Sequence, residues 1–62
     1  MTISNYYENL INAQDKLTDI IENDNEDRTD LEWEQWVSDT IRMLSREFGV
    51  SVADLDEFYQ FI

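Results

Sequence analysis

Residues 29–49 read TDLEWEQWVSDTIRMLSREFG and carry the start, the buried face and the end of one amphipathic helix. Thr29, followed three residues later by Glu32, fits the S/T-x-x-E capping box that satisfies backbone donors at a helix start. An apolar stripe with helical spacing follows and consists of Trp33, Val37, Ile41, Leu44 and Phe48. Gly49 ends the stretch, because glycine readily takes the left-handed conformation of a helix C-terminus. We therefore expect a helix over residues 30–48.

A longer amphipathic helix is predicted toward the N-terminus, over residues 3–22. Its apolar residues recur at alternating steps of four and three, as Tyr6, Leu10, Ala13, Leu17 and Ile20. Ser4 is the expected N-cap, since a serine hydroxyl can accept a hydrogen bond from the first turn. Residues 23–28 contain no apolar side chain, so we expect them to form a solvated connection between the two helices.

A short third helix is predicted over residues 52–61. Ser51 with Asp54 gives a second capping signature, and the apolar residues that share one face are Val52, Leu55, Phe58, Tyr59 and Ile62. No alternation of Val, Ile and Thr is long enough for a strand. The predicted fold class is therefore all-α, a small three-helix bundle. Residues 1–62 are expected to form a single acidic helical domain, because a chain of this length has room for one small core.

Composition excludes most enzyme classes. The chain contains neither cysteine nor histidine, so it can form no disulfide and no Cys–His or Ser–His catalytic pair. We expect no catalytic residue and no cofactor. The N-terminus lacks the basic and apolar segments of a signal peptide, and no stretch approaches the roughly 20 apolar residues of a membrane span. A cytoplasmic protein without a membrane partner is expected.

Clustered acids in residues 24–35 invite comparison with a calcium-binding loop. In that loop, position six is a glycine that forms the sharp turn, and position twelve is a glutamate that binds the metal with both oxygens. Counted from Asp24, these positions hold Thr29 and Gln35. The pattern fails at both places, so we expect no specific metal site.

Charge is the main functional clue. Fifteen Asp and Glu residues against four Lys and Arg residues give a formal net charge of −11. On the first predicted helix the acids fall opposite Leu10 and Leu17, and no base stands four residues away from them to form the usual helical pairs. Between residues 15 and 34 only Lys16 and Arg28 oppose them. The expected partner-binding acids are Glu8, Asp15, Asp19, Glu22, Asp24, Glu26, Asp27, Asp30 and Glu34.

An acidic helix of this kind can imitate a nucleic acid. Carboxylates at steps of three and four residues repeat about every 5–6 Å along a rigid rod, which is comparable with the separation of backbone phosphates. We therefore expect a non-catalytic inhibitor that blocks the groove of a basic nucleic-acid-binding protein and does not itself bind nucleic acid. In size, charge and lack of catalytic residues, the chain is similar to small acidic phage and mobile-element inhibitors of the anti-CRISPR and anti-restriction type, which act in the host cytoplasm.

Residues 44–55, LSREFGVSVADL, resemble the turn region of a helix-turn-helix module. The resemblance implies a tight corner between two helices, after which Leu55 returns to the core. The matching recognition helix carries Asp54, Asp56 and Glu57 and no base, so its approach to DNA phosphates would be repulsive. We therefore expect ordinary helical packing at this corner.

An alternative function rests on three apolar residues, Trp36, Met43 and Phe61. Trp36 lies about 100° around its helix from Val37, near Met43, and Phe61 lies on the flank of the third helix. Trp and Met on a flank are typical of partner surfaces, although Trp36 can also cover the core edge. The alternative is a small helical adaptor or antitoxin-like module that binds a partner through this apolar face. If Trp36 and Phe61 are exposed, a homodimer would supply burial that the monomer lacks.

Overall fold

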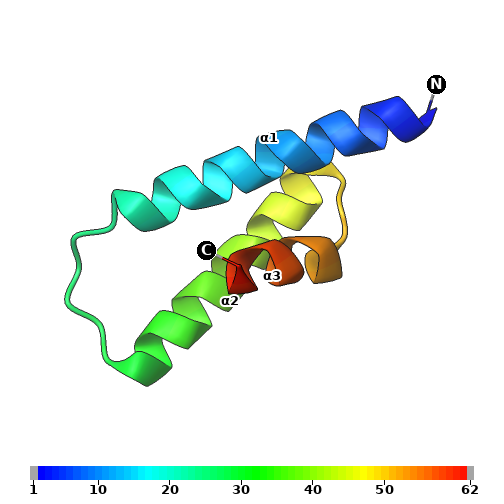
Figure 1. The fold of residues 1–62 in the computed structure, drawn as a ribbon. Helices are drawn as coiled ribbons and strands as arrows, with labels where there is room; N and C mark the ends of the chain where they lie inside the picture. The colour runs from blue at the N-terminus through cyan, green and yellow to red at the C-terminus, as the bar shows by residue number, and fades with distance from the viewer. Residues whose placement is uncertain (1, 62) are drawn as a thin grey trace.

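Three helices, joined by two short connections, make up the computed structural model, which describes residues 2–61 and the side chains of residues 5–61. Helix α1 spans Thr2–Glu22, α2 spans Asp30–Phe48 and α3 spans Val52–Gln60, and each helix contacts the other two (Figure 1). The predicted all-α, three-helix arrangement is confirmed. Ile62, which the sequence assigns to the apolar face of the third helix, lies outside the described residues.

Helix α1 begins earlier than the sequence predicts. The chain is already helical at Thr2, so Ser4 lies inside the helix and the prediction that Ser4 is the N-cap is wrong. Serine is only mildly unfavourable inside a helix, and no proline or glycine precedes it to stop the helix from extending. The end of α1 at Glu22 and both ends of α2 lie where the sequence places them.

Both ends of α2 are closed by the predicted local interactions. The Thr29 hydroxyl oxygen accepts a hydrogen bond from the Glu32 amide at 3.2 Å, and the Thr29 amide donates to Glu32 Oε1 at 3.0 Å. At the other end Gly49 has φ 68° and ψ 40°, the left-handed conformation. This turn lets the Val50 amide donate to the Ser45 carbonyl at 3.0 Å. The chain therefore turns sharply from α2 into α3, as its helix-turn-helix resemblance implies.

Each helix places one fully buried leucine in the core: Leu17 from α1, Leu44 from α2 and Leu55 from α3. The remaining buried apolar residues are Ala13, Val37, Ile41 and Val50. Val50 belongs to the corner between α2 and α3, so the turn itself is anchored in the core. With so few buried side chains, each one carries a large share of the stability of the domain.

The two tryptophans of α2 lie in the half of the helix nearer the connection at residues 23–29, and both pack against the edge of the core. Toward this connection α1 and α2 diverge (Figure 1). The ring centroids of Trp33 and Trp36 lie 5.2 Å apart at a tilt of 46°. Trp33 Nε1 donates a hydrogen bond to the Tyr59 hydroxyl at 2.9 Å, which ties α2 to α3. A tryptophan that is nearly buried needs such a partner for its N–H group.

A second polar link joins α1 to the start of α3. The Tyr6 hydroxyl accepts a hydrogen bond from the Ser51 amide at 3.1 Å and donates one to Asp54 Oδ2 at 2.5 Å. Ser51 caps α3 by accepting from the Ala53 amide at 3.1 Å. The second capping signature is therefore correct for Ser51 but not for Asp54. Instead of reaching back to the Ser51 amide, Asp54 binds the tyrosine that lies between them.

Truncating a core leucine should unfold a large fraction of the molecules. We expect Leu44→Ala to lower the free energy of unfolding by about 2–5 kcal/mol, because the lost burial is accompanied by a cavity. Leu31→Ala is the matched control, since Leu31 is mostly exposed on the same helix, and it should change stability by no more than about 0.5 kcal/mol. Urea and thermal unfolding followed by circular dichroism measure both, and equal losses would contradict the assignment of the core.

The link through Tyr6 should make stability sensitive to alkaline pH. The hydrogen bond to Asp54 raises the pKa of the Tyr6 hydroxyl above its ordinary value of 10.0. Because folding favours the protonated phenol, its contribution is complete below about pH 10 and is lost as the pH rises through the folded-state pKa. Tyr6→Phe should therefore be less stable than wild type at pH 8, and the difference should shrink above about pH 10.

Chemical unfolding of both proteins across this pH range measures that difference. Tyr7→Phe is the control, because Tyr7 has no hydrogen-bond partner among the described side chains. If Tyr6→Phe remained less stable than wild type by the same free energy at high pH, the stabilisation would not depend on the protonated hydroxyl.

Candidate functional site

The outward side of α1 carries a row of carboxylates, which we call the acidic face: Glu8, Asp15, Asp19 and Glu22. All of them are exposed, and the buried residues Ala13 and Leu17 lie on the other side of the helix. From Glu8 to Glu22 the row covers about 21 Å of helix axis at a rise of 1.5 Å per residue. The structure thus holds these predicted site residues on one rigid element with their charges facing solvent.

Cations do little to neutralise the acidic face. The ion pairs formed within residues 5–61 are Arg28 with Asp24 and Arg42 with Asp39, and neither involves a carboxylate of that face. Lys16 is exposed on α1 and takes part in neither. Asp19 accepts a hydrogen bond from Asn23 Nδ2 at 2.9 Å, but an amide leaves the carboxylate charge in place.

Two carboxylates of the acidic face also stand at the unfavourable end of their helix. Asp19 and Glu22 lie in the last turn of α1, which contains no base, next to the negative end of the helix dipole. In α2 the situation is reversed, because Asp30 and Glu32 occupy the first turn, where a negative charge stabilises a helix. Helix stability therefore accounts for the acids that begin α2 but not for those that end α1.

Asp24, which the sequence groups with the partner-binding acids, differs from the others because its side chain is largely buried. Its side chain is 7% exposed, and its Oδ1 lies 2.5 Å from Arg28 Nη1. The guanidinium of Arg28 in turn lies 4.1 Å from the ring centroid of Trp36. Asp24 thus pairs with Arg28, and Arg28 in turn holds the connection against Trp36 of α2. Glu26 and Asp27, on the same connection, remain exposed as predicted.

The Arg28 contact also explains the environment of Trp36. The sequence leaves open whether Trp36 covers the core edge or forms a partner surface, and the structure makes it half-buried and packed against the core. The Arg28 guanidinium of the connection also lies against its ring in a cation–π contact, which the sequence does not predict. In a helix, the four-residue separation of Asp24 and Arg28 would predict an ion pair. Residues 24–29 are not helical, so the spacing rule for helices does not predict the pair that forms there.

Asp30 and Glu34 point away from the acidic face. Both line a groove between α2 and α3, together with Asp56. The exposed predicted acids therefore fall into three groups: the α1 row, a pair beside α3, and Glu26 and Asp27, which line a hollow with residues of α2. The single acidic surface that the sequence suggests is divided, because α3 packs along the side of α2 that carries Asp30 and Glu34.

The three apolar candidates do not form one surface. Met43 is 52% exposed and lies beside Arg42 and Arg46 on α2, whereas Trp36 is half-buried, with Arg28 against its ring. Phe61 is 85% exposed, but it follows α3, which packs on the other side of α2 from Trp36 and Met43. An apolar docking face that combines these three side chains is not present.

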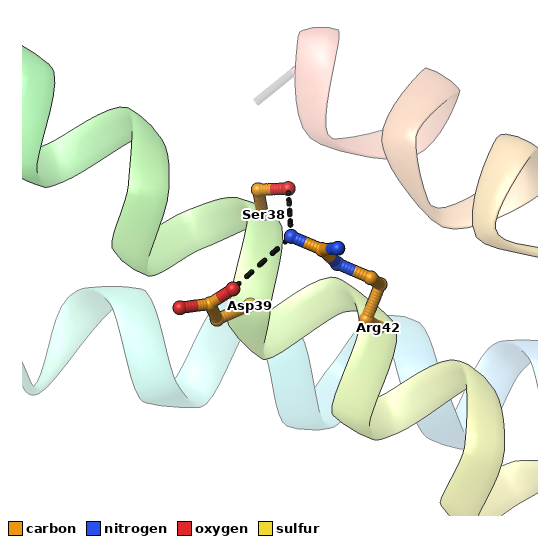
Figure 2. A network of polar contacts seen from close by, with 3 residues as sticks. All are labelled: Ser38, Asp39 and Arg42. Atoms are coloured by element: carbon orange, nitrogen blue, oxygen red, sulfur yellow. Dashed lines mark hydrogen bonds and ion pairs between the residues drawn. The ribbon is translucent and has the colours of Figure 1, made fainter.

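The outward side of α2 differs from that of α1 because it contains an ion pair. Figure 2 shows Arg42 reaching back along α2, where its Nη2 donates to Asp39 Oδ1 at 3.1 Å and to Ser38 Oγ at 3.3 Å. Arg46, one turn further on, adds a second positive charge to this side. On this side of α2 the carboxylate of Asp39 is therefore neutralised by an ion pair, whereas no carboxylate of the acidic face forms one.

Three further findings complete the description of the site. Over the described part of the chain, no group of three or more acidic side chains is arranged to hold a metal ion. None of the described helices contains a segment of sufficient length and apolarity to cross a bilayer.

Comparisons with protein-family models, with curated proteins and with solved structures give no match to this chain. Its function must therefore be argued from the charges and contacts themselves.

The opposite roles of acids at the two helix ends can be tested by identical substitutions. Glu22→Ala should raise the free energy of unfolding by about 0.3–1 kcal/mol, because it removes a charge from the negative end of α1. Glu32→Ala, which removes the capping box and a favourable charge, should lower it by roughly 1 kcal/mol. Both variants replace Glu with Ala and therefore gain the same helix propensity. The difference between their free energies of unfolding thus reports the position of the residue in its helix. Thermal unfolding measures it, and a destabilised Glu22→Ala would show that Glu22 serves the fold.

Proposed function

We propose that this chain is a non-catalytic inhibitor that occupies the nucleic-acid-binding groove of a basic protein in place of the nucleic acid. The observation that carries the proposal is the acidic face of α1, a row of exposed carboxylates that lacks paired cations and has two members at the unfavourable end of the helix dipole. Charges that do not stabilise the fold are best explained by what they bind.

The electrostatics of such a row suit a groove lined with Lys and Arg. Proteins that bind nucleic acids gain much of their affinity from neutralising closely spaced phosphates. The acidic face supplies closely spaced negative charges on a helix, so the target meets them already ordered and spends little free energy on ordering them. The net charge of −11 would also speed encounter with a basic protein and make binding fall as salt rises.

The alternative, an adaptor that binds through an apolar face, has less support. Trp36 is half-buried with Arg28 against its ring, and Met43 and Phe61 lie on different sides of α2. A homodimer that buries both Trp36 and Phe61 has no single surface on which to form. The proposal therefore assigns binding to the charged face of the molecule.

The class of protein that this proposal implies is the small anti-defence inhibitor of phages and mobile elements. Inhibitors of that class act on cytoplasmic enzymes that handle nucleic acid, such as restriction or CRISPR nucleases, and the composition of this chain is similar to theirs. Glu26 and Asp27 would extend the contact beyond the end of α1, since both are exposed on the connection that follows it.

Neutralising the acidic face tests the proposal. The protein is immobilised, a lysate of the host cell is passed over it, and the affinity of each retained protein is then measured against salt concentration. The variant Asp15→Asn, Asp19→Asn, Glu22→Gln should bind roughly tenfold or more weakly than wild type, with a smaller dependence on salt.

A matched control separates local charge from net charge. Glu47→Gln, Asp56→Asn, Glu57→Gln also removes three exposed negative charges, but none of them belongs to the acidic face. This variant should retain most of the wild-type affinity. Equal weakening by both variants, affinity that does not depend on salt, or the absence of any retained protein would reject the proposal.

A further inference from the structure

The four carboxylates of the acidic face form one row along α1. A duplex presents two phosphate rows, which face each other across a minor groove of about 6 Å and a major groove of about 12 Å. The outward side of α2 carries three acids and two bases, of which Glu32 closes the capping box and Asp39 pairs with Arg42: Glu32, Asp39, Glu47, Arg42 and Arg46. On α3 Asp56 and Glu57 are consecutive and so point about 100° apart. Neither helix supplies a second row parallel to the acidic face.

Apolar side chains lie directly beside that row on the same helix. Tyr7 is 64% exposed and Ile11 is 40% exposed, and neither is among the side chains packed against the core. They are one turn apart on the helix. At 100° per residue, Ile11 is about 40° around the helix from Asp15 and about 60° from Glu8. Any groove that holds the acidic face therefore also meets Tyr7 and Ile11.

This combination matches the surface of a single strand. In a duplex the bases are stacked inside and the outer surface is dominated by phosphate, whereas a single strand exposes base faces beside its phosphates. Proteins that bind single strands accordingly combine a positively charged groove with aromatic side chains on which the bases stack. An exposed aromatic ring and a branched aliphatic chain next to carboxylates would satisfy both parts of such a groove.

We propose that the target groove binds single-stranded nucleic acid, with the acidic face in the place of the phosphates and Tyr7 and Ile11 in the place of bases. This inference rests on the proposed function and narrows its target to one class of partner. The tie between Tyr6 and α3 supports it, because it fixes the turn of α1 that carries Tyr7.

Competition by two nucleic acids tests the inference. The immobilised protein, loaded with the proteins it retains from host lysate, is challenged with an oligothymidylate of roughly 30 nucleotides and with a duplex at the same phosphate concentration. The oligothymidylate should release the retained protein at a concentration about tenfold lower than the duplex. Release by the duplex at an equal or lower concentration would overturn this inference and leave the proposed function standing. Release by neither would reject the proposed function as well.

Substitutions beside the acidic face provide a second test. Tyr7→Ser, Ile11→Ser should weaken binding about tenfold, in line with the loss of one or two stacking contacts, and leave its salt dependence unchanged. Tyr7→Phe should bind as wild type, because the ring and not the hydroxyl makes the contact. Leu31→Ser, Val52→Ser is the matched control, since both residues are exposed and apolar but lie on other helices.

Circular dichroism and thermal unfolding establish that each variant is folded before its affinity is measured. Wild-type affinity for the folded Tyr7→Ser, Ile11→Ser protein would overturn the inference. So would an equal loss in the Leu31→Ser, Val52→Ser control, because the effect would then not be specific to the edge of the acidic face.

Discussion

Leu17, Leu44 and Leu55 are fully buried, one from each helix, and the rest of the structure depends on that burial. A chain of 62 residues with a net charge of −11 must overcome the mutual repulsion of its carboxylates with a core of only a few side chains. Because these leucines share one core, displacing any one helix would expose the buried leucines of the other two. Because the core is so small, the orientation of every outward side chain, including the acidic face, depends on it.

Three polar contacts around the core fix how the helices meet. The Tyr6 hydroxyl joins α1 to the start of α3, the Trp33 indole joins α2 to Tyr59, and Arg28 holds the first connection against Trp36. Each of them lies at an edge, where the apolar side chains are only half-buried. Such contacts contribute modestly to stability. Their geometry is directional, however, so they define the relative position of the elements more narrowly than apolar packing alone does.

The acids of this protein divide according to what they do for the fold. Glu32 closes a capping box, Asp24 holds Arg28, Asp39 pairs with Arg42 and Asp54 receives Tyr6. Of the carboxylates of the acidic face, only Asp19 accepts a side-chain hydrogen bond among the described residues, from Asn23, and none forms an ion pair. Two of them also oppose the dipole of their own helix. This division gives the proposed function its physical basis, because binding is assigned to charges that the fold does not use.

The sequence by itself determined the three helices, the closure of α2 and the solvent side of α1, because a helix is built from hydrogen bonds and periodicities that span only a few residues. Only the tertiary structure decided that Tyr6 meets Asp54, that Arg28 lies against Trp36, and that Asp30 and Glu34 turn toward α3. These contacts depend on how the helices pack and how an irregular connection folds back. Local spacing does not carry that information, since partners distant in the chain come together only when the core forms.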